Sequence, residues 1–534
     1  MTAPSASVRT VRDAAFDVLR LHGLTTLFAN PGSTEVSVLA DLPEDVEFVL
    51  ALHEGSVVGT ATGWALAREQ PALVLLHTTA GLGNAVGALA TARVNRAPLV
   101  VLVGQQDRRH LAQQPFLAGR LEGLAGDYPV RVESPVRAQD VPGAIGRAVH
   151  AARAGRGPAL VLVPMDDWSQ PAEDLPVPAP DTVRRSAAAD PQDVAEVAEL
   201  LARSSAPALV VGAGADSAAT WTALTALAER LDCPVWQEPF GARAGFPQDH
   251  RLFAGHLPAD RPRLRATLAP HDLVLCVGAP FLRQYPYAPG RLTQARVVVI
   301  TDDPAEAHHS PAELAVVTPL PDFCDRLTRR TPPREPRRTA APRQSAPVPD
   351  GSLTPAHVLA ALADRLPADT VVVEETPSSR PDLHALLPAR APLGFLSAAM
   401  GGLGFALPAA VGVRMARPRR PVVAVAGDGS SLYQIQALWT AAHYGVGALF
   451  VILANGRYAV MDKLAAQHGG KPPWPAFGEV SVAGLAESLG CPARRIGTYA
   501  DLCATLDELC PELVGRTAPL VLEVAVTADG DFRP

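Results

Sequence analysis

Two short polar stretches in the last third of the chain have the residue types of a site for a metal ion and phosphate. They are Gly427-Asp428-Gly429-Ser430 and Asn455-Gly456. One carboxylate and one amide oxygen are ligands that suit Mg²⁺, and glycine lets a backbone approach a ligand closely. A single Gly-Asp-Gly is more often only a tight turn, but together with the later Asn-Gly it predicts a site for Mg²⁺ and a diphosphate.

The segments around these stretches predict how they are positioned. Pro421 to Ala426 and Ala448 to Ala454 are apolar runs that indicate buried parallel strands, and Tyr433 to Tyr444 predicts the helix between them. A strand-helix-strand unit places both strands parallel in one sheet. Asp428 and Asn455 would then lie together at the carboxyl end of that sheet, where open α/β sheets bind ligands.

Two proline-rich stretches divide the rest of the chain. Residues 169–190 and 329–349 have few apolar side chains and read as exposed linkers. We therefore predict domains at about 1–170, 188–328 and 352–534. Each alternates apolar strand candidates with amphipathic helices, which predicts an α/β protein of three doubly wound domains with parallel sheets.

Three reactive side chains follow predicted strands in the first domain. After a predicted helix at Val8 to His22, the strands are Thr26 to Ala29, Glu47 to Leu52, Ala72 to Leu76 and Leu99 to Val103. Ser33, Glu54 and His77 lie just past the ends of the first three of them. The pattern therefore predicts these three side chains along one edge of one sheet.

The central region has a weaker signal. Strands are predicted at Ala208 to Val211, Leu273 to Val277 and Val297 to Ile300, and Gly212-Ala-Gly214 follows the first of them. A lone Gly-x-Gly is a weak dinucleotide motif and more often a tight turn. The acidic Asp302 and Asp303 could meet a ribose, but we do not expect a nucleotide here.

Composition excludes several other classes of protein. The 534 residues carry a net charge of −7, with 48% hydrophobic and 19% charged residues, so nothing favours nucleic acid. The six cysteines are scattered without metal-ligand spacing, which indicates buried free thiols. We see no signal peptide and no apolar run of membrane-spanning length, and therefore expect a cytoplasmic protein that has no membrane partner.

A resemblance covers all three domains in order. The chain resembles the thiamine diphosphate-dependent 2-oxo acid decarboxylases, and among them most closely the benzoylformate decarboxylases. The matching stretches are Phe28 to Glu35, Leu52 to Gly55, Leu76-His77, Ala80 to Leu89, Gly278 to Pro280, Gly401 to Ala410, Gly427 to Ser430, Ala437 to Ala442 and Asn455-Gly456. The resemblance implies pyrimidine-binding, central and diphosphate-binding domains. It also implies sites between subunits, hence a homo-oligomer that is at least a dimer and is expected to be a tetramer.

The resemblance implies roles for residues of the first domain. Glu54 matches the carboxylate that contacts the pyrimidine ring and activates the cofactor. His77 matches a proton-transfer residue, a task that suits an imidazole of nearly neutral pKa. Ser33 matches a serine that binds the substrate carboxylate, although a serine here could equally cap the following helix.

The resemblance also implies the cofactor site. Asp428, the Asn455 side chain and the Arg457 carbonyl match the ligands of Mg²⁺, and Leu403 matches the large apolar residue under the cofactor. The positions that match the cofactor site are Asn30, Pro31, Gly32, Glu54, Ser378, Gly401, Leu403, Gly427, Asp428, Gly429, Ser430, Asn455, Gly456 and Tyr458.

The chain departs from the benzoylformate decarboxylases in the predicted substrate pocket. Tyr285 stands where they have a second catalytic histidine, and a phenol of pKa near 10 is a poorer proton shuttle. The predicted pocket positions are Ser33, Tyr285, Ser397, Met400, Val460, Met461 and Leu464. These changes question benzoylformate as the substrate, and a slower protonation step would favour carboligation with an aldehyde.

We therefore expect a non-oxidative decarboxylase of a small 2-oxo acid, with carboligation alongside decarboxylation. The alternatives are a carboligase of the acetolactate synthase kind, an oxidase with FAD in the central domain, and a degenerate subunit with a binding role. The presence of Glu54, Asp428 and Asn455 together argues against the last of these.

Overall fold

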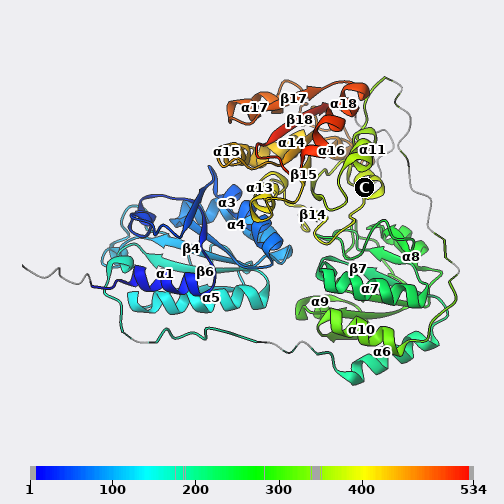
Figure 1. Ribbon diagram of the computed structural model, residues 1–534, viewed down its shortest axis with the longest axis horizontal. Coiled ribbons are helices and arrows are strands. Elements are labelled where there is room, and N and C mark those ends of the chain that lie inside the picture. Colours follow the sequence, from blue (N-terminus) through cyan, green and yellow to red (C-terminus); the bar gives the residue numbers. More distant parts are fainter. Residues whose placement is uncertain are drawn as a thin grey trace, which may run out of the picture.

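The computed structural model describes residues 8–527 except 175, 185, 187, 282, 337, 340–344, 346–348 and 350. Its strands form three sheets of six strands each, and all strand pairs within the sheets are parallel. Figure 1 shows three lobes, the first in blue and cyan, the central in green, and the third in yellow to red. The predicted α/β fold of three parallel-sheet units is confirmed.

The first sheet has the order β2-β1-β3-β4-β6-β5, with five helices along its chain segment. The strands are β1 (Thr26–Asn30), β2 (Glu47–Leu50), β3 (Ala72–His77), β4 (Leu99–Gln105), β5 (Arg131–Glu133) and β6 (Pro158–Pro164). The helices are α1 (Val11–Leu21), α2 (Val36–Leu39), α3 (Glu54–Arg68), α4 (Thr78–Val94) and α5 (Val141–Gly155).

The central sheet has the order β12-β11-β10-β7-β8-β9. The strands are β7 (Pro207–Val211), β8 (Val235–Gln237), β9 (Phe253–His256), β10 (Leu273–Val277), β11 (Arg296–Thr301) and β12 (Leu314–Val317). The helices are α6 (Pro191–Arg203), α7 (Ala218–Leu231), α8 (Arg261–Leu268), α9 (Pro304–His309) and α10 (Leu320–Arg330).

The third sheet has the order β14-β13-β15-β16-β18-β17. The strands are β13 (Val371–Glu375), β14 (Phe395–Ser397), β15 (Val422–Gly427), β16 (Leu449–Ala454), β17 (Ala493–Ile496) and β18 (Leu520–Ala525). The helices are α11 (Pro355–Arg365), α12 (Arg380–Leu386), α13 (Ala406–Ala416), α14 (Asp428–Ser431), α15 (Ala437–His443), α16 (Ala459–Gln467), α17 (Val482–Ser488) and α18 (Tyr499–Leu509).

The inner strands are buried on both faces. Every residue of β7 and β10 is buried, which is the reason these strands are runs of β-branched and other apolar residues rather than alternating patterns. The strand β13 is also buried throughout and ends in two glutamates, Glu374 and Glu375. The edge strands β5 and β17 carry exposed charged side chains. Their mixed composition explains why the sequence pattern did not reveal them.

Helix α3 joins the first lobe to the third. It is buried from Glu54 to Ala67, as expected for a helix that is apolar on all sides. In the third lobe α3 packs against α13. A Cβ placed on Gly63 of α3 would overlap the Ala409 carbonyl of α13, and one on Gly412 of α13 would overlap the Thr60 carbonyl of α3. Glycine therefore allows the two helix backbones to touch.

Two helix predictions need correction. The helix predicted from Val8 begins at Val11, because the Thr10 side chain accepts from the Asp13 N–H and caps it there. The helix predicted from Tyr433 begins only at Ala437, after a short 3₁₀ turn. The Gln434 side chain in that turn accepts from Ser56 Oγ at 2.6 Å, which ties it to α3.

The two predicted linkers connect the lobes (Figure 1). The described part of 169–190 is mostly exposed. The start of 329–349 is less free than expected, because α10 extends to Arg330 and Arg334 donates to the Ser204 carbonyl at 2.6 Å. Residues 337, 340–344 and 346–348 of this stretch lie outside the described part of the chain.

None of the helices in the described part of the chain is both long enough and apolar enough to cross a membrane.

The contact between α3 and α13 can be tested with Gly63→Ala. We expect the added methyl group to force the helices apart and to lower the free energy of unfolding by about 1–3 kcal/mol. The control is Gly497→Ala, where an added Cβ meets nothing within 4 Å. Chemical denaturation of both variants measures the difference, and equal stabilities would contradict the close contact.

Candidate active site

Asp428 lies at the end of β15, the central strand of the third sheet, and its carboxylate is held by the backbone. Oδ1 accepts from the Gly429 N–H at 2.8 Å, and Oδ2 accepts from the N–H groups of Asn455 and Gly456 at 2.9 and 2.6 Å. Burial raises the pKa of the Asp428 carboxyl above its ordinary value, and these amides oppose the rise. A bound cation would favour the ionised form.

The Asn455 turn lies beside Asp428, as the strand order β15-β16 requires. Asn455 Oδ1 accepts from the Arg457 N–H at 3.1 Å, and Gly456 has a φ of +67° that favours glycine. Tyr458 packs against Phe477 with ring centres 5.0 Å apart and the ring planes tilted by 57°. A Cβ on Gly429 would lie 2.6 Å from the Tyr458 ring. Glycine at this position therefore lets the Tyr458 ring lie close to the backbone of the turn.

Other predicted residues of the third lobe lie in loops and helices at the same edge of its sheet. Ser378 follows β13, and its Oγ accepts from the Val460 N–H at 3.0 Å. Met400, Gly401 and Leu403 follow β14, and the methionine and leucine are 44% and 36% exposed. Ser430 lies in α14, and Val460, Met461 and Leu464 lie in α16. The structure thus brings these residues to one edge.

Glu54 is the first residue of α3 in the first lobe, and two side-chain amides hold it. Asn30 Nδ2 donates to Oε1 at 3.2 Å, and Asn84 Nδ2 donates to Oε2 at 3.0 Å. Glu54 as a whole residue is only 8% exposed. Asn30 ends β1 and begins the Asn30-Pro31-Gly32 turn. Asn84 comes from α4, and the sequence pattern gave no sign that this residue would hold Glu54.

His77 ends β3 next to a second carboxylate. Its Nδ1 lies 2.9 Å from Glu35 Oε2 and 3.0 Å from Thr34 Oγ. Glu35 also accepts from the Gly32 N–H at 2.8 Å. A donated Nδ1–H leaves the His77 Nε2 atom as the acceptor that points away from this pair. Sequence reasoning missed Glu35, although it ends the quoted stretch Phe28 to Glu35.

The backbone around His77 is shaped to hold the ring. A Cβ on Gly32 would lie 2.5 Å from the imidazole, so only glycine lets the turn lie against it. Thr78, the next residue along, has a φ of +32°. A β-branched residue in that region is strained by about 1–3 kcal/mol, and such strain is concentrated at functional sites.

Three predicted pocket residues differ in their surroundings. Ser33 is exposed and is the first residue of a 3₁₀ turn whose N-cap position is Gly32, so Ser33 does not cap that turn. Tyr285, from the central lobe, is 56% exposed. Ser397 is 1% exposed, and its Oγ donates to Glu374 and accepts from Arg380 at 2.7 and 2.8 Å. In this chain the Ser397 hydroxyl is therefore engaged inside the third lobe.

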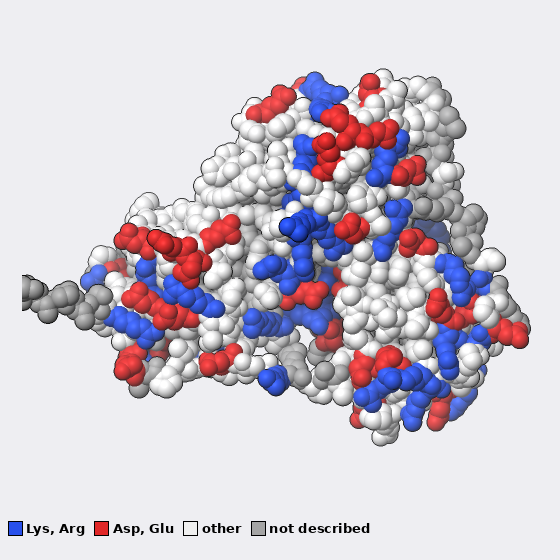
Figure 2. All heavy atoms as spheres, viewed as in Figure 1, with Lys and Arg blue, Asp and Glu red and all other residues white. Residues whose placement is uncertain are grey.

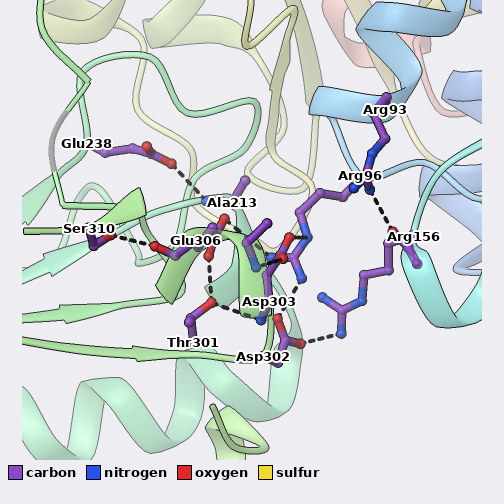
Figure 3. A network of polar contacts seen from close by, with 12 residues as sticks. Arg93, Arg96, Arg156, Ala213, Glu238, Thr301, Asp302, Asp303, Glu306 and Ser310 are labelled. Carbon is purple, nitrogen blue, oxygen red and sulfur yellow. Dashed lines mark hydrogen bonds and ion pairs between the residues drawn. The ribbon is translucent and has the colours of Figure 1, made fainter. Parts of the chain in front are cut away.

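The Gly212-Ala-Gly214 turn of the central lobe faces a buried carboxylate. Glu238, which follows β8, is 3% exposed, and its Oε1 accepts from the Ala213 N–H at 3.4 Å. Burial raises the pKa of Glu238 to about 7. A nucleotide phosphate at this turn would meet that carboxylate. Asp302, which we had considered for a ribose, instead pairs with Arg96 at 2.7 Å (Figure 3).

The residues at the edge of the third sheet fit a diphosphate with a cation. In the described part of the chain, no group of three or more His, Cys, Asp and Glu side chains has the geometry of a metal site. The Asp428 turn supplies one carboxylate and one side-chain amide oxygen, so an ion would need further oxygens from its ligand. A metal-bound diphosphate supplies oxygens of that kind.

Three parallel-sheet lobes with a clamped carboxylate in the first and an Asp-Asn turn in the third define a class of thiamine diphosphate enzyme. Family models match residues 9–121, 194–327 and 378–524, described as the N-terminal TPP binding, central and C-terminal TPP binding domains of thiamine pyrophosphate enzymes. The chain belongs to the thiamine pyrophosphate enzyme family, and its cofactor is thiamine diphosphate.

Similar proteins include decarboxylases. Benzoylformate decarboxylase of Pseudomonas aeruginosa is 39% identical over 530 residues, covering 97% of this chain and 99% of that protein. The structure of a 4-hydroxybenzoylformate decarboxylase from Rhodococcus jostii is 34% identical with a TM-score of 0.93, covering 98% of this chain and all of the other. An acetolactate synthase large subunit of Parasynechococcus marenigrum is 30% identical, covering 94% and 86%.

The buried Glu238 predicts a pH dependence of stability. Its folded pKa of about 7 lies above the ordinary value of 4.5, so the folded state binds the proton more tightly. Stability due to this group is therefore present below pH 4.5 and lost as the pH rises towards 7. As the pH rises from 4.5 to 7, we expect the free energy of unfolding to fall less in Glu238→Gln than in the native chain. The difference between the two proteins should reach up to about 3 kcal/mol.

The matched control is Glu196→Gln, an exposed position in α6. Chemical denaturation at pH 5 and pH 8 measures the difference for each protein. Parallel curves for the native chain and Glu238→Gln would mean that Glu238 is ionised equally in both states.

Proposed function

We propose that the chain is a non-oxidative decarboxylase of a small 2-oxo acid of the benzoylformate type, and that it uses thiamine diphosphate with Mg²⁺. The observation that carries this proposal is the way two groups of the first lobe are held by hydrogen bonds. Glu54 accepts from two side-chain amides, and His77 is hydrogen-bonded to Glu35. The relatives named above support decarboxylation as the reaction class.

Glu54 would act on the cofactor. Bound thiamine diphosphate supplies an electron sink for the carbon that loses carbon dioxide. The amides of Asn30 and Asn84 fix both carboxylate oxygens, so Glu54 keeps one orientation at the start of α3. A carboxylate fixed in this way can hold a proton at a ring nitrogen of the cofactor.

His77 would move the proton that the product gains. The bond from Nδ1 to Glu35 orients the ring and leaves Nε2 to exchange the proton with the substrate. Glu35 is a positioning residue in this scheme, because it acts through the imidazole. Ser33 is exposed beside this pair, and we propose that its hydroxyl binds the substrate carboxylate.

The third lobe would hold the diphosphate end. Asp428, Asn455 and the Arg457 carbonyl would bind Mg²⁺, and Ser378, Gly429, Ser430, Gly456 and Tyr458 would surround the diphosphate. Gly401 and Leu403 would support the rings between the two ends. Ser397, Met400, Val460, Met461, Leu464 and Tyr285 would border the substrate.

We propose a site completed by a second copy of the chain, in a dimer or larger homo-oligomer. Several large apolar side chains of the single chain are exposed near the residues assigned above: Leu52, Met400, Leu403, Tyr433 and Met461 are 36–52% exposed. Exposed apolar side chains of this kind favour an interface. Sedimentation equilibrium measures the oligomer, and a monomer that is fully active would contradict this part of the proposal.

Glu54→Gln tests the assignment of the cofactor-activating group. The variant keeps the size of the side chain, but one of the two amide donors then faces an NH₂ group. We expect turnover to fall by about 10²- to 10⁴-fold with little change in thermal midpoint. The control is Glu44→Gln, an exposed position of the same lobe. Unchanged turnover in Glu54→Gln would overturn the cofactor argument.

A panel of aromatic, branched and linear 2-oxo acids tests the substrate class. Each acid is scored for carbon dioxide and for the identity of the organic product, with and without an added aldehyde. We expect an aldehyde from an aromatic acid, and a 2-hydroxyketone when an acceptor aldehyde is present. Pyruvate converted mainly to a 2-hydroxy-3-oxo acid would favour the acetolactate synthase-like alternative.

A further inference from the structure

The segment between β14 and α13 is anchored to other parts of the chain near both of its ends. At its far end, the Glu375 carboxylate accepts from the N–H groups of Gly404, Phe405 and Ala406 at 2.7 Å each. At its near end, the Ser397 N–H donates to the Ala242 carbonyl of the central lobe at 2.9 Å. Between these anchors, Met400 and Leu403 are exposed.

This segment also touches the turn that follows Asp428. A Cβ on Gly404 would lie 2.7 Å from the Gln434 side chain and 3.0 Å from that of Tyr433. Both residues belong to the 3₁₀ turn directly after α14. The Gly404 end of the segment therefore packs against the turn that directly follows Asp428 and α14.

Asn95, from the first lobe, forms hydrogen bonds to the start of this segment in the third lobe. It follows α4 and is completely buried. Its Nδ2 donates to the Ser397 carbonyl at 2.9 Å, and its Oδ1 accepts from the Ala399 N–H at 3.0 Å. Only an amide side chain offers a donor and an acceptor side by side in this way. Removing it would leave two buried backbone groups unpaired, at about 1–3 kcal/mol each.

Arg96, the next residue, fastens the same helix end to the central lobe (Figure 3). Its guanidinium donates to Asp302 at 2.7 Å and lies 3.6 Å from both Asp303 and Glu306. Asp302 also accepts from Arg156. Arg96 has a φ of +63°, a conformation that a non-glycine residue keeps only where its surroundings hold it. Figure 2 shows basic and acidic atoms side by side where the three lobes meet.

The central lobe reaches the same segment from the other side. Arg283 Nη1 donates to the Ala399 carbonyl at 3.3 Å. The Ala399 residue is thus held through its N–H by the first lobe and through its carbonyl by the central lobe. Arg283 is two residues from Tyr285, so the Tyr285 loop shares this anchor.

We infer that Asn95 is a positioning residue for the Ala399–Leu403 segment, and that its amide sets the geometry of the thiamine diphosphate site from outside it. The bonds to Ser397 and Ala399 carry this inference. The consequence for the reaction rests on the proposed function. The consequence for the backbone and for cofactor binding does not.

The test compares Asn95→Ala, with Asn95→Ser as a milder second variant, and Ile145→Val as a control. Ile145 is a fully buried residue of α5 in the other face of the first lobe, so its variant loses stability without touching the segment. Hydrogen exchange is followed without cofactor in peptides that cover residues 395–405 and 422–431. Thermal midpoints are then measured with and without thiamine diphosphate and Mg²⁺.

In the Asn95 variants we expect exchange of the 395–405 amides to rise at least about tenfold, since the Ala399 N–H loses its acceptor. The 422–431 peptide should exchange as in the native chain. The stabilisation by thiamine diphosphate and Mg²⁺ should fall by at least half relative to Ile145→Val. With a substrate, kcat should fall about tenfold or more while KM stays within a factor of about three.

Native exchange rates in the 395–405 peptide, or unchanged stabilisation by the cofactor, would overturn the inference for Asn95. If the native chain decarboxylates no 2-oxo acid while the exchange and binding results appear as expected, the proposed function is wrong and the positioning role stands.

Discussion

The packing of α3 against α13 is the constraint on which the site depends. Glycine at Gly63 and Gly412 lets the two helix backbones meet without intervening side chains. The first residue of α3 is Glu54, and the turn before α13 carries Gly401 and Leu403. One rigid contact therefore fixes where the first lobe presents its carboxylate and where the third lobe begins its cofactor-facing segment.

The polar contacts also orient the functional groups of the two lobes. Each functional carboxylate is oriented by neutral donors rather than by a cation: Glu54 by two asparagine amides, Asp428 by three backbone N–H groups. Neutral donors fix the direction of a carboxylate while leaving its negative charge available to a ring nitrogen or a metal ion. The buried Arg96 lies elsewhere, at the junction of the lobes, where it is paired with acidic residues of the central lobe.

The central lobe contributes to the proposed cofactor site through its contacts with the other two lobes. Its Gly212-Ala-Gly214 turn faces Glu238, and its Asp302 is occupied by arginines of the first lobe. Two strand ends at the edge where such sheets commonly bind ligands carry Glu238 and the ion pairs of Asp302 with Arg96 and Arg156. The lobe also reaches the third lobe through Arg283 and Ala242, so it braces the segment that follows β14.

The sequence by itself determined the α/β class, several inner strands such as β3, β4, β15 and β16, and the positions of Glu54, His77, Asp428 and Asn455. Buried parallel strands need continuous apolar runs, and the residue after such a strand must lie at one edge of its sheet. Only the tertiary structure decided which distant residues hold these groups. The bonds of Asn84 to Glu54, Glu35 to His77, and Asn95 to Ser397 join residues from separate elements, and no local pattern records a partner that is brought near only by folding.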